Sequence, residues 1–522
     1  MRKNKRALVV ILVLAMVFSM VPTMAMATSF KDMPKNWSTG ALEKAVENGL
    51  LTGSNGKILA QNNLTRAEMA AILGRAFGAK AGAVVKFADV KPGDCCDADI
   101  QKAVSMKTFL GSNGKMNPAA PITREEAFVV LARALHLSAE NGDLSAFADG
   151  KKVSSWARDN VAAMVKAGYV AGNGGKLYPQ DNITRAEFAV IMDNALKTYI
   201  KKAGTYTQSV QGNVMVSADN VILKDLTIKG DLIIGDGVGT GDITLDNVKV
   251  EGRTVVRGGG VNSVKIMGNS KLGSLIIGRT DGAVRVVTSG GATVETVFIN
   301  DGKDDVIVEG KFNNVQVDTD IPVMLNNADI KNVTATGQNA NLTVSSNSKV
   351  ETVATGMANT TINVQGTVSN IAVTKDAVGA NVNVAKGGTA TNVVTAAAKT
   401  TIANDGKMGT LSFAKNATDA KIVVGDNSTM AKVITESKSN LTITTAAAEA
   451  AAKAEATAKA AAAKAEADKL AADKALAQAK TAEEKAAAEA AQKAAAEAVA
   501  KAEADKTAAN KQVTDTKAEA DK

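Results

Sequence analysis

The sequence Leu-Thr-Arg-Ala-Glu at residues 64–68 returns twice, as Ile-Thr-Arg-Glu-Glu at 122–126 and as Ile-Thr-Arg-Ala-Glu at 183–187. The arginines of successive copies are 58 and 61 residues apart. In each copy the Thr hydroxyl and the Glu carboxylate can bond each other's backbone N–H, which is the capping box that begins an α-helix. Apolar residues follow the first copy at helical spacing, including Met69 and Ile72. The chain therefore contains three copies of one helical unit.

The residues before each capping box also repeat. Each copy starts with Phe-x-Asp, continues with a helical stretch and then reaches a turn that contains two glycines. The starts are residues 30–32, 87–89 and 147–149, the helical stretches are 41–48, 100–106 and 161–167, and the turns are 53–56, 111–114 and 172–174. We therefore predict an all-α region of three repeats, at 28–80, 85–138 and 145–200, each built as helix, glycine turn and helix.

The capping box accounts for the Thr and the Glu of each copy but not for the Arg between them. Arg66, Arg124 and Arg185 take the first helical position, where the helix dipole already places partial positive charge. An arginine beside the free N–H groups of a helix N-terminus is typical of an anion-binding site. The alternative is a salt bridge from each arginine to a neighbouring carboxylate.

These motifs resemble the S-layer homology family of bacterial surface proteins, and the resemblance covers about residues 29–198. It rests on the Phe-x-Asp start, a Trp, the glycine turn and the Thr-Arg-x-Glu element, in three tandem copies. The resemblance implies a pseudo-threefold helical domain with grooves between its units. It also implies that these grooves bind secondary cell-wall polysaccharide, often through a pyruvyl ketal on an amino sugar, or another polymer linked to peptidoglycan.

The resemblance assigns roles to particular residues by their position in the motif. The arginine that contacts the carboxylate in that family corresponds to Arg66, Arg124 and Arg185. The groove aspartate and aromatic residue correspond to Asp32 with Trp37, and to Asp149 with Trp156. The second unit keeps Asp89, but Cys95 and Cys96 stand near the place of its Trp. We therefore expect the groove of that unit to be weaker or purely structural.

The indole face of each Trp suits stacking on a sugar ring, and each Asp suits bonding to sugar hydroxyls. Packing between units is an equally good explanation for a large aromatic residue. The single histidine, His136, follows an apolar helix face, and we expect it to pack at an edge. No spaced set of metal ligands surrounds the two cysteines. We therefore predict no metal and no cofactor.

Residues 1–27 have the pattern of a signal peptide: a basic start, an apolar run over 7–20 and Ala-Met-Ala at 25–27. No later segment is long and apolar enough to span a bilayer. The net charge is +8, of which four charges belong to the basic start of the signal peptide, and the remaining basic residues alternate with acidic ones. This pattern does not indicate nucleic-acid binding. We expect an exported protein of the cell wall or surface.

From residue 206 to residue 445 the chain is rich in short alternating apolar triplets separated by Asn, Asp and Gly. The triplets at 221–223, 226–228 and 232–234 recur 22 residues later, and the period then tightens to 20. Two apolar columns follow that period: Val333, Val353, Val373, Val393, Phe413 and Val433, and Leu342, Ile362, Val382, Ile402 and Ile422. The period predicts a parallel β-solenoid of about eleven coils, rather than an array of β-sandwiches.

Asp225 and Asn247 occupy equivalent turns of this solenoid, where their side chains can bond the backbone of the bend. Paired carboxylates on such a fold could hydrolyse or cleave a polysaccharide. The candidates are Asp301, Asp304 and Asp305, or Asp236 and Asp242. No base, nucleophile and metal set converges around them in the sequence. We therefore predict no catalytic residues, with a wall-bound lyase or hydrolase as the alternative.

The last segment, residues 446–522, consists almost entirely of Ala, Lys, Glu and Asp, which favour a helix. Leu470, Leu476, Val499 and Val513 are too sparse for a leucine-zipper seam. We predict one extended helix or a weak alanine coiled coil. Together the segments predict a non-enzymatic surface protein with a wall anchor, a solenoid and a helical tail, which can associate with itself in a surface layer.

Overall fold

The computed structural model describes residues 30–80, 85–138, 142–300, 304–426, 428–436 and 441–520. The predicted signal peptide, residues 1–27, lies outside these ranges. The chain divides into two compact units, Met1–Thr244 with Val248–Gly259, and Leu245–Asn247 with Gly260–Lys522. The first unit contains the helical repeats and the first solenoid coils, and the second contains the later coils and the tail.

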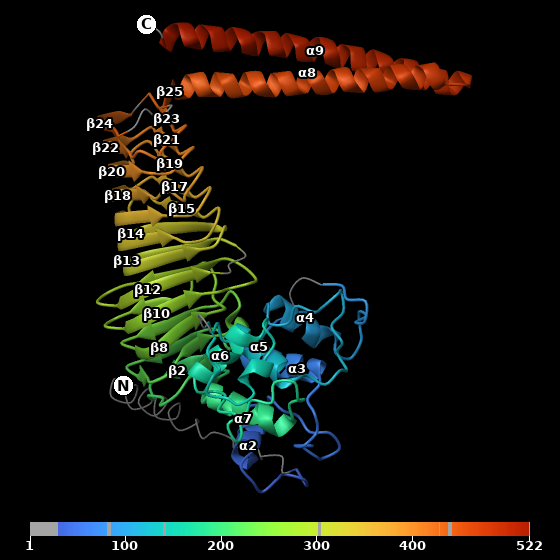
Figure 1. Cartoon of the computed structure of the whole chain (residues 1–522), viewed down its shortest axis with the longest axis vertical. Helices are drawn as coiled ribbons and strands as arrows, with labels where there is room; N and C mark the ends of the chain where they lie inside the picture. Colours follow the sequence, from blue (N-terminus) through green and yellow to red (C-terminus); the bar gives the residue numbers. More distant parts are fainter. Residues whose placement is uncertain are drawn as a thin grey trace, which may run out of the picture. The chain divides into compact units, whose positions relative to one another are not determined.

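Each helical repeat has the predicted order of a first helix, a glycine turn and a capped second helix (Figure 1). The elements are α2 (Thr39–Glu47), α3 (Arg66–Phe77), α4 (Asp97–Ser105), α5 (Arg124–Ala134), η1 (Gly150–Lys152), α6 (Arg158–Lys166) and α7 (Arg185–Ala195). Their apolar faces meet in a common core, in which Phe77, Phe128 and Phe188 are almost completely buried.

Three short segments close the repeats into a ring. The N–H of Leu64 donates to the carbonyl of Ile183 at 2.9 Å, and the N–H of Ile183 donates to the carbonyl of Ile122 at 3.1 Å. The N–H of Ile122 returns to the carbonyl of Leu64 at 2.9 Å. Because each repeat donates to one neighbour and accepts from the other, none of the three is left with an unpaired end.

Residues 198–445 form a parallel β-solenoid of about 12 turns, which confirms the predicted fold class. In the first unit the elements are β1 (Thr198–Ile200), β2 (Gly204–Tyr206), β3 (Val214–Val216), β4 (Val221–Lys224), β5 (Thr227–Ile228), β6 (Leu232–Ile234), η2 (Asp236–Val238), β7 (Ile243–Asp246) and β8 (Lys249–Val256). Their registers confirm the early period, because Ile228 pairs with Val250 and Ile233 pairs with Val255.

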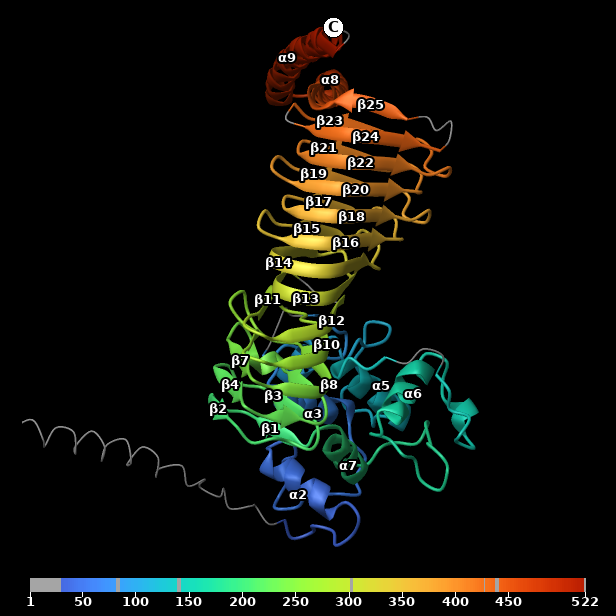
Figure 2. The ribbon, with the colours of Figure 1, turned by 90° about the vertical axis from the view of Figure 1, so that its left-hand side faces the viewer.

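The strands of the later coils belong to the second unit (Figure 2). They are β9 (Lys265–Met267), β10 (Lys271–Ile277), β11 (Val284–Thr288), β12 (Thr293–Asn300), β13 (Val306–Asp318), β14 (Pro322–Ala335), β15 (Asn341–Val344), β16 (Lys349–Thr355), β17 (Thr361–Val364), β18 (Thr367–Val373), β19 (Asn381–Val384), β20 (Thr389–Thr395), β21 (Thr401–Asn404), β22 (Lys407–Phe413), β23 (Lys421–Val424), β24 (Thr429–Thr435) and β25 (Thr442–Thr445).

One of the two predicted apolar columns is confirmed residue by residue. Leu342, Ile362, Val382, Ile402 and Ile422 pair in sequence at the predicted period and are buried. The other column is wrong in part. Its pairs run Val333, Val353, Ile371, Val393, Leu411 and Val433, so that Val373 and Phe413 belong to a different row.

The second column departs from a strict period because short and long steps alternate along it. The step from Val353 to Ile371 is short, and the step from Ile371 to Val393 is long. Two residues, 365–366, connect β17 to β18, whereas four residues, 385–388, connect β19 to β20. A change of two residues keeps the same side chains pointing inward, because side chains alternate between faces with a period of two. The average period hides this alternation.

One corner of the coils uses left-handed backbone. Asp225 and Asn247 have φ of 51° and 54°, as their predicted place in a turn requires. In the later coils the corner recurs at the predicted period with positive φ, at Asn339, Asn359, Gly379, Lys399 and Asp419. Asn, Asp and Gly tolerate this region of backbone space better than other residues, which explains their regular appearance in the sequence.

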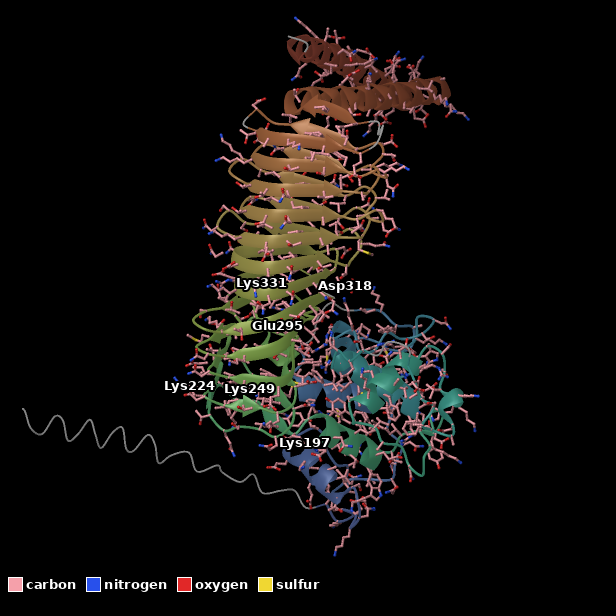
Figure 3. The ribbon with its side chains drawn as sticks, turned by 60° about the vertical axis from the view of Figure 1, so that its left-hand side comes forward. Lys197, Lys224, Lys249, Glu295, Asp318 and Lys331 are labelled. Atoms are coloured by element: carbon pink, nitrogen blue, oxygen red, sulfur yellow. The ribbon has the colours of Figure 1, made fainter. Side chains whose placement is uncertain are left out.

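Several charged side chains of the solenoid lie on its outer surface, although Arg257 and Arg279 are buried. Figure 3 labels Lys224, Lys249, Glu295, Asp318 and Lys331, which are all exposed. The inward positions beside them are aliphatic and almost completely buried, for example Leu223 and Val250. This division of polar and apolar residues gives the coil stack its core.

The tail contains two helices, α8 (Ala446–Gln478) and α9 (Ala482–Ala520), which lie side by side (Figures 1 and 2). Ala462, Ala465 and Ala502 form the seam between them. The prediction of one extended helix is therefore wrong, because the tail is two helices, and the alternative of a weak alanine coiled coil stays a prediction. No helix in the described ranges has both the length and the apolar character that a membrane span requires.

The break between the two tail helices has a local cause. Thr481 Oγ1 accepts a hydrogen bond from the N–H of Glu484 at 3.1 Å, and the Glu484 carboxylate accepts from the N–H of Thr481 at 3.0 Å. This is a fourth capping box, in the sequence Thr-Ala-Glu-Glu at 481–484, and it starts α9. The sequence contains this motif, but no apolar run follows it to indicate the start of a helix.

Candidate functional site

All three predicted capping boxes are present in the helical ring. Thr65, Thr123 and Thr184 each accept from the backbone N–H three residues later, and the Glu at that position bonds back to the Thr N–H. These contacts involve only one carboxylate oxygen, Oε2, of each glutamate. The other oxygen, Oε1, remains for a second partner.

That second partner is the motif arginine of a neighbouring repeat. The side chains of Arg66, Arg124 and Arg185 are 15%, 9% and 9% exposed, whereas their glutamate partners are 32%, 32% and 43% exposed, so each pair is buried on its arginine side only. The three ion pairs join Arg66 to Glu126 at 2.9 Å, Arg124 to Glu187 at 2.6 Å, and Arg185 to Glu68 at 2.9 Å. The alternative that the sequence left open, a salt bridge to a neighbouring carboxylate, is therefore present in all three copies.

The N–H groups expected to be free at these helix N-termini are occupied. The backbone N–H of Arg66 donates to the carbonyl of Ala120 at 3.0 Å, and that of Arg185 donates to the carbonyl of Asn62 at 3.0 Å. Arg124 makes the corresponding bond to Asp181 at 2.9 Å. The prediction of an anion site built on free helix N–H groups is wrong, because the neighbouring repeat uses these donors to close the ring.

The three aspartates of the Phe-x-Asp starts hold a loop of their own repeat. Asp32 accepts from the N–H groups of Ile58 and Leu59 at 2.7 and 2.9 Å. Asp89 accepts from Met116 and Asn117, and Asp149 accepts from Leu177 and Tyr178, at 2.7–2.9 Å. The second residue of each pair has a left-handed backbone, with φ of 55° at Leu59, 51° at Asn117 and 52° at Tyr178. Leu and Tyr rarely adopt this conformation, so the carboxylate stabilises a strained loop.

The same loops receive the arginines. The carbonyls of Ile58, Met116 and Leu177 accept the Nε–H of Arg185, Arg66 and Arg124 at 2.8–3.0 Å. Each Asp thus positions a carbonyl for an arginine of a neighbouring repeat. The N–H of Met116 is the main cause that lowers the pKa of Asp89 below its usual value, so this carboxyl stays ionised as the clamp requires. A direct contact between these aspartates and a sugar stays a prediction.

Trp37 and Trp156 have 64% and 55% of their surfaces exposed. Packing between units, the alternative for these residues, would bury them. Each stands immediately before the N-cap residue of its first helix, and Cys95 holds the same position before the N-cap of α4. The second repeat therefore presents an exposed Cys95 where the others present an indole.

A hollow of about 210 Å³ opens where Arg185 meets the first repeat. Thr52, Gly53, Ser54, Glu68 and Arg75 line it together with Arg185. The Arg185 guanidinium donates to Ile58, Glu68 and Thr52, which accounts for three of the five N–H groups that a guanidinium carries. One carboxylate and two guanidinium groups leave this hollow with a net charge of +1.

Sequence reasoning missed the second cation of this hollow. Arg75 lies nine residues after Arg66 and donates to the carbonyl of Leu50 at 3.0 Å. Arg133 lies nine residues after Arg124 and donates to the carbonyl of Thr108 at 3.4 Å. The third repeat has Asn194 at the equivalent position, bonded to the carbonyl of Tyr169. The signal was an arginine at a constant offset from the motif in two of three copies.

Two of the acidic residues considered for catalysis, Asp236 and Asp304, have other contacts. Both carboxylate oxygens of Asp236 accept from the Arg257 guanidinium, at 2.7 and 3.1 Å. Asp304 accepts from the N–H of Asp305, and Asp301 lies outside the described residues. Within the described ranges, no group of three or more His, Cys, Asp or Glu side chains could hold a metal ion.

His136 makes a polar contact rather than packing at an apolar edge. Its Nε2 lies 2.9 Å from an Arg257 nitrogen, and because a guanidinium can only donate, the imidazole is the acceptor. Burial, followed by the positive charge of Arg257, lowers the pKa of His136 to about 3. The His136 imidazole is therefore neutral at physiological pH.

The ring geometry agrees with a comparison with known families. The family described as the S-layer homology domain matches residues 29–70 and 146–189. Two segments of the chain thus match the S-layer homology domain. The segment at 85–138, which the family match leaves out, has an S-layer homology-like capping box, aspartate clamp and place in the ring.

Proteins with similar sequence include surface-layer proteins and an enzyme. The chain is 32% identical over 191 residues to the surface-layer 125 kDa protein of Lysinibacillus sphaericus, which is 35% of this chain and 16% of that protein. It is 27% identical over 192 residues to an S-layer protein of Bacillus anthracis, covering 36% and 20%. It is 31% identical over 176 residues to an amylopullulanase of Thermoanaerobacterium thermosulfurigenes, covering 32% and 10%.

The chain thus spans only a tenth to a fifth of the length of these relatives. S-layer homology domains and similarity to S-layer proteins indicate a secreted protein of the cell surface. This agrees with the localisation predicted from the sequence.

Proposed function

We propose that the ring of residues 28–200 anchors this surface protein non-covalently to secondary cell-wall polysaccharide or another peptidoglycan-linked polymer. In this proposal residues 85–138 are a third, diverged S-layer homology domain, because they supply Arg124, Glu126 and Asp89 to the same cyclic contacts as the other two. The anionic group on the polymer is a carboxylate, as a pyruvylated sugar would provide.

The observation that carries the proposal is the hollow beside Arg185. Its lining combines two guanidinium groups with a single carboxylate, Glu68, and it opens to solvent. A carboxylate ligand would accept from the N–H groups that Arg185 and Arg75 do not use within the ring. Position 53 has no space for a side chain larger than that of glycine, since a Cβ there would lie within 2.5 Å of the Phe30 ring and the Lys57 carbonyl.

The three grooves are expected to differ in strength. The groove of Arg66 also has Arg133, whereas the groove of Arg124 has Asn194 in place of that second cation. The exposed indoles of Trp37 and Trp156 would stack on sugar rings, and Cys95 cannot replace them. Because Asn194 replaces the second cation in the Arg124 groove, we rank that groove as the weakest for an anionic ligand.

The solenoid and the tail are proposed to be structural, S-layer or adhesive elements, with self-association in a surface layer. The solenoid's aliphatic interior and its outward Asn and Thr side chains fit a stiff spacer. A wall-bound lyase or hydrolase gains no support from Asp236, because Arg257 occupies both of its oxygens. We propose that the protein is not an enzyme.

The test uses the full-length secreted protein and purified wall sacculi, before and after chemical removal of their polysaccharide. Arg75→Gln removes one cation from the hollow without breaking a contact between repeats, since the Arg75 side chain bonds Leu50 of its own repeat. Loss of a charge-assisted hydrogen bond worth about 1.5–3 kcal/mol should weaken sedimentation with intact sacculi roughly ten- to hundredfold. Lys91→Gln, an exposed residue outside the hollow, is the matched control.

The proposal also requires that sacculi without their polysaccharide bind neither Arg75→Gln nor Lys91→Gln. Arg124→Gln should weaken wall binding less than Arg75→Gln once the folded fraction is taken into account. If Arg75→Gln binds intact sacculi as tightly as the unchanged protein, the hollow is not the anion site. If stripped sacculi bind as well as intact ones, the polysaccharide is not the partner.

A further inference from the structure

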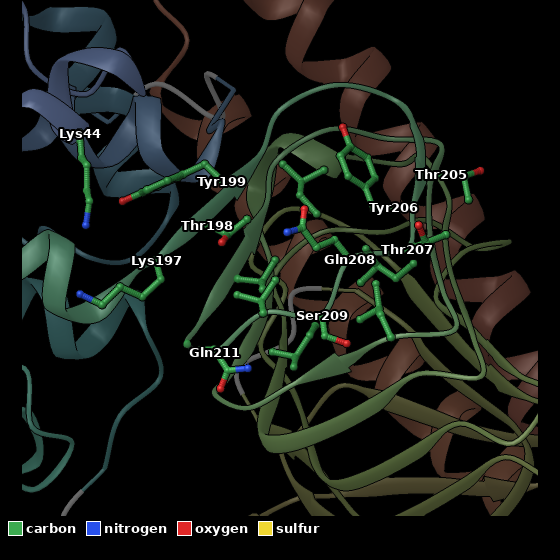
Figure 4. A pocket seen from close by; sticks show the side chains of 17 residues that line it. Lys44, Lys197, Thr198, Tyr199, Thr205, Tyr206, Thr207, Gln208, Ser209 and Gln211 are labelled. Carbon is green, nitrogen blue, oxygen red and sulfur yellow. The ribbon is translucent and has the colours of Figure 1, made fainter. Parts of the chain in front are cut away.

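A second and larger hollow lies in the first unit, at the beginning of the solenoid. Its volume is about 750 Å³, and Figure 4 shows the side chains that line it. Ile200, Val214, Leu223, Leu226 and Ile228 form its apolar floor, and each of them is at most 6% exposed. A concave site of this size, with an apolar lining and a few polar groups, is typical of small-ligand sites.

The rim of this hollow is unusually rich in hydroxyl and amide groups. It is formed by residues 205–211, Thr-Tyr-Thr-Gln-Ser-Val-Gln, in which six of seven side chains carry one of these groups. Tyr199 and Tyr206 both line the hollow, although the whole chain has only four tyrosines. Figure 4 shows Tyr206, Gln208 and Ser209 on the same side of the hollow, across from Lys44 and Lys197.

The charged groups of the hollow are two lysines that share one carboxylate. Lys44 and Lys197 line it, and both bond the carboxylate of Asp193, at 2.9 and 3.3 Å. No Asp or Glu is among the described residues that line it. Burial raises the pKa of Tyr199, which keeps this phenol a neutral hydrogen-bonding group. One carboxylate shared by two lysines leaves a net charge of +1 beside the hollow, whereas residues 205–211, across from these lysines, carry no charge.

Hydroxyl and amide groups above an apolar floor match the surface of a sugar, which has hydroxyls around its edge and C–H groups on its faces. Tyr rings can pack on such C–H faces while their hydroxyls bond to the edge. Part of the rim is held in shape by backbone contacts, since Ser209 Oγ accepts the N–H of Thr227 at 2.9 Å and the Tyr206 hydroxyl donates to the Lys202 carbonyl at 3.0 Å. The site is thus preorganised on both sides of Gln208.

We propose that this hollow is a second carbohydrate-binding site, separate from the grooves of the ring, which takes an uncharged oligosaccharide of two or three sugar units. It does not rest on the wall-anchoring proposal. The ring would bind an anionic group on its polymer, whereas this site would bind a neutral part of that polymer or another glycan.

The experiment is a calorimetric titration of the full-length protein with two neutral probes, chitotriose and maltotriose, and with two contrasting probes, a hyaluronan tetrasaccharide and dodecanoate. We expect saturable binding of a neutral trisaccharide. Gln208 lies on an exposed loop, and Gln208→Ala should weaken this binding about tenfold by loss of hydrogen bonding. Tyr206→Ala should weaken it by a similar factor through loss of stacking. Gln316→Ala, an exposed glutamine on β13, is the matched control and should change nothing.

Three results would overturn the proposal. One is that neither neutral trisaccharide binds at millimolar concentration. Another is that Gln208→Ala and Tyr206→Ala both bind as the unchanged protein does. The third is that dodecanoate binds more tightly than either trisaccharide, which would make this an apolar ligand site. Arg75→Gln, which tests the wall anchor, should leave trisaccharide binding unchanged, so that failure of one proposal is distinguishable from failure of the other.

Discussion

The helical ring and the β-solenoid are both built from repeats, but different interactions join their repeats. In the ring, each repeat is joined to the next by a particular ion pair, such as Arg185 with Glu68, and by a backbone hydrogen bond. In the solenoid, each coil is joined to the next by strand pairing and by columns of buried aliphatic side chains. The ring thus depends on specific partners, whereas the solenoid depends on a repeated apolar position.

The difference also shows at the ends of each structure. A ring of three repeats has no ends, and each capping-box glutamate pairs with an arginine of a neighbouring repeat. A stack has a last layer, and there Val433 and Ile443 are 42% and 64% exposed, although Leu411 and Ile422 before them in the same columns are buried. Stability in a solenoid is approximately a sum over neighbouring coils, so damage to one coil should stay local.

The largest expected effect is an exception to this comparison, because it comes from a buried polar residue of the solenoid, Arg257. The Arg257 side chain is 1% exposed and bonds Asp236, His136 and the Met106 carbonyl. Arg257→Ala would leave the Asp236 carboxylate, which is 11% exposed, without its partner and should cost about 3–5 kcal/mol of unfolding free energy. Urea unfolding followed by tryptophan fluorescence measures this, because Trp37 and Trp156 are the only tryptophans in the chain.

Arg253→Ala provides the control for that experiment. Arg253 pairs with Asp231 and is 25% exposed on its side chain, so its loss should cost less than the loss of Arg257. An unchanged unfolding midpoint for Arg257→Ala would show that this buried cluster does not contribute to the stability of the first unit.

The next effect tests whether damage in the solenoid is local. Ile402 is completely buried between Val382 and Ile422. Ile402→Ala should cost about 3 kcal/mol, because the aliphatic column cannot close the cavity completely. Hydrogen exchange should accelerate in β19, β21 and β23, while the tryptophan-monitored unfolding of the ring stays unchanged. Asn392→Ala, on the outer surface, should have little effect, and a change in the ring would contradict the local picture.

A pH-dependent effect is expected from His136. Its pKa is lowered to about 3 in the folded protein from an ordinary value of 6.5, so the unfolded chain takes up the proton first as the pH falls. Stability should therefore decline from about pH 6.5 downwards, by about 2 kcal/mol at pH 5. His136→Gln keeps an acceptor for Arg257 but cannot titrate, so the loss of stability between pH 7 and pH 5 should shrink by that amount. An identical decline in both proteins would assign the acid sensitivity to other groups.

The smallest effect sharpens the comparison by placing the same motif in two settings. Thr65 begins a helix inside the ring, whereas Thr481 begins α9 in the exposed tail. Thr481→Ala should remove one N-cap bond at a cost of about 1 kcal/mol or less. Faster hydrogen exchange at residues 482–486 would report it, with the ring unaffected. Thr65→Ala should lower the unfolding free energy of the ring by a similar amount. A larger loss there would mean that the cap also supports the contact between repeats.

The repeat architecture was predictable because its causes are local or periodic. A capping box needs only residues three apart, so Thr65 with Glu68 could be read directly from the sequence. The solenoid needs only a recurring apolar position, so the column of Ile362 and Val382 could be read as well. Left-handed corners at Asp225 and Asn247 followed from residue types that tolerate them.

The partners of the motif residues were decided by the tertiary structure. Arg185 and Glu68 are 117 residues apart, and Asp32 meets Ile58 through a loop whose path no short motif describes. The sequence showed that the arginines were unexplained by their own helices and favoured an anionic ligand, but it could not show that a neighbouring carboxylate already pairs with each of them. That choice depends on which charges the closed ring brings within hydrogen-bond distance, and ring closure is a property of all three repeats together.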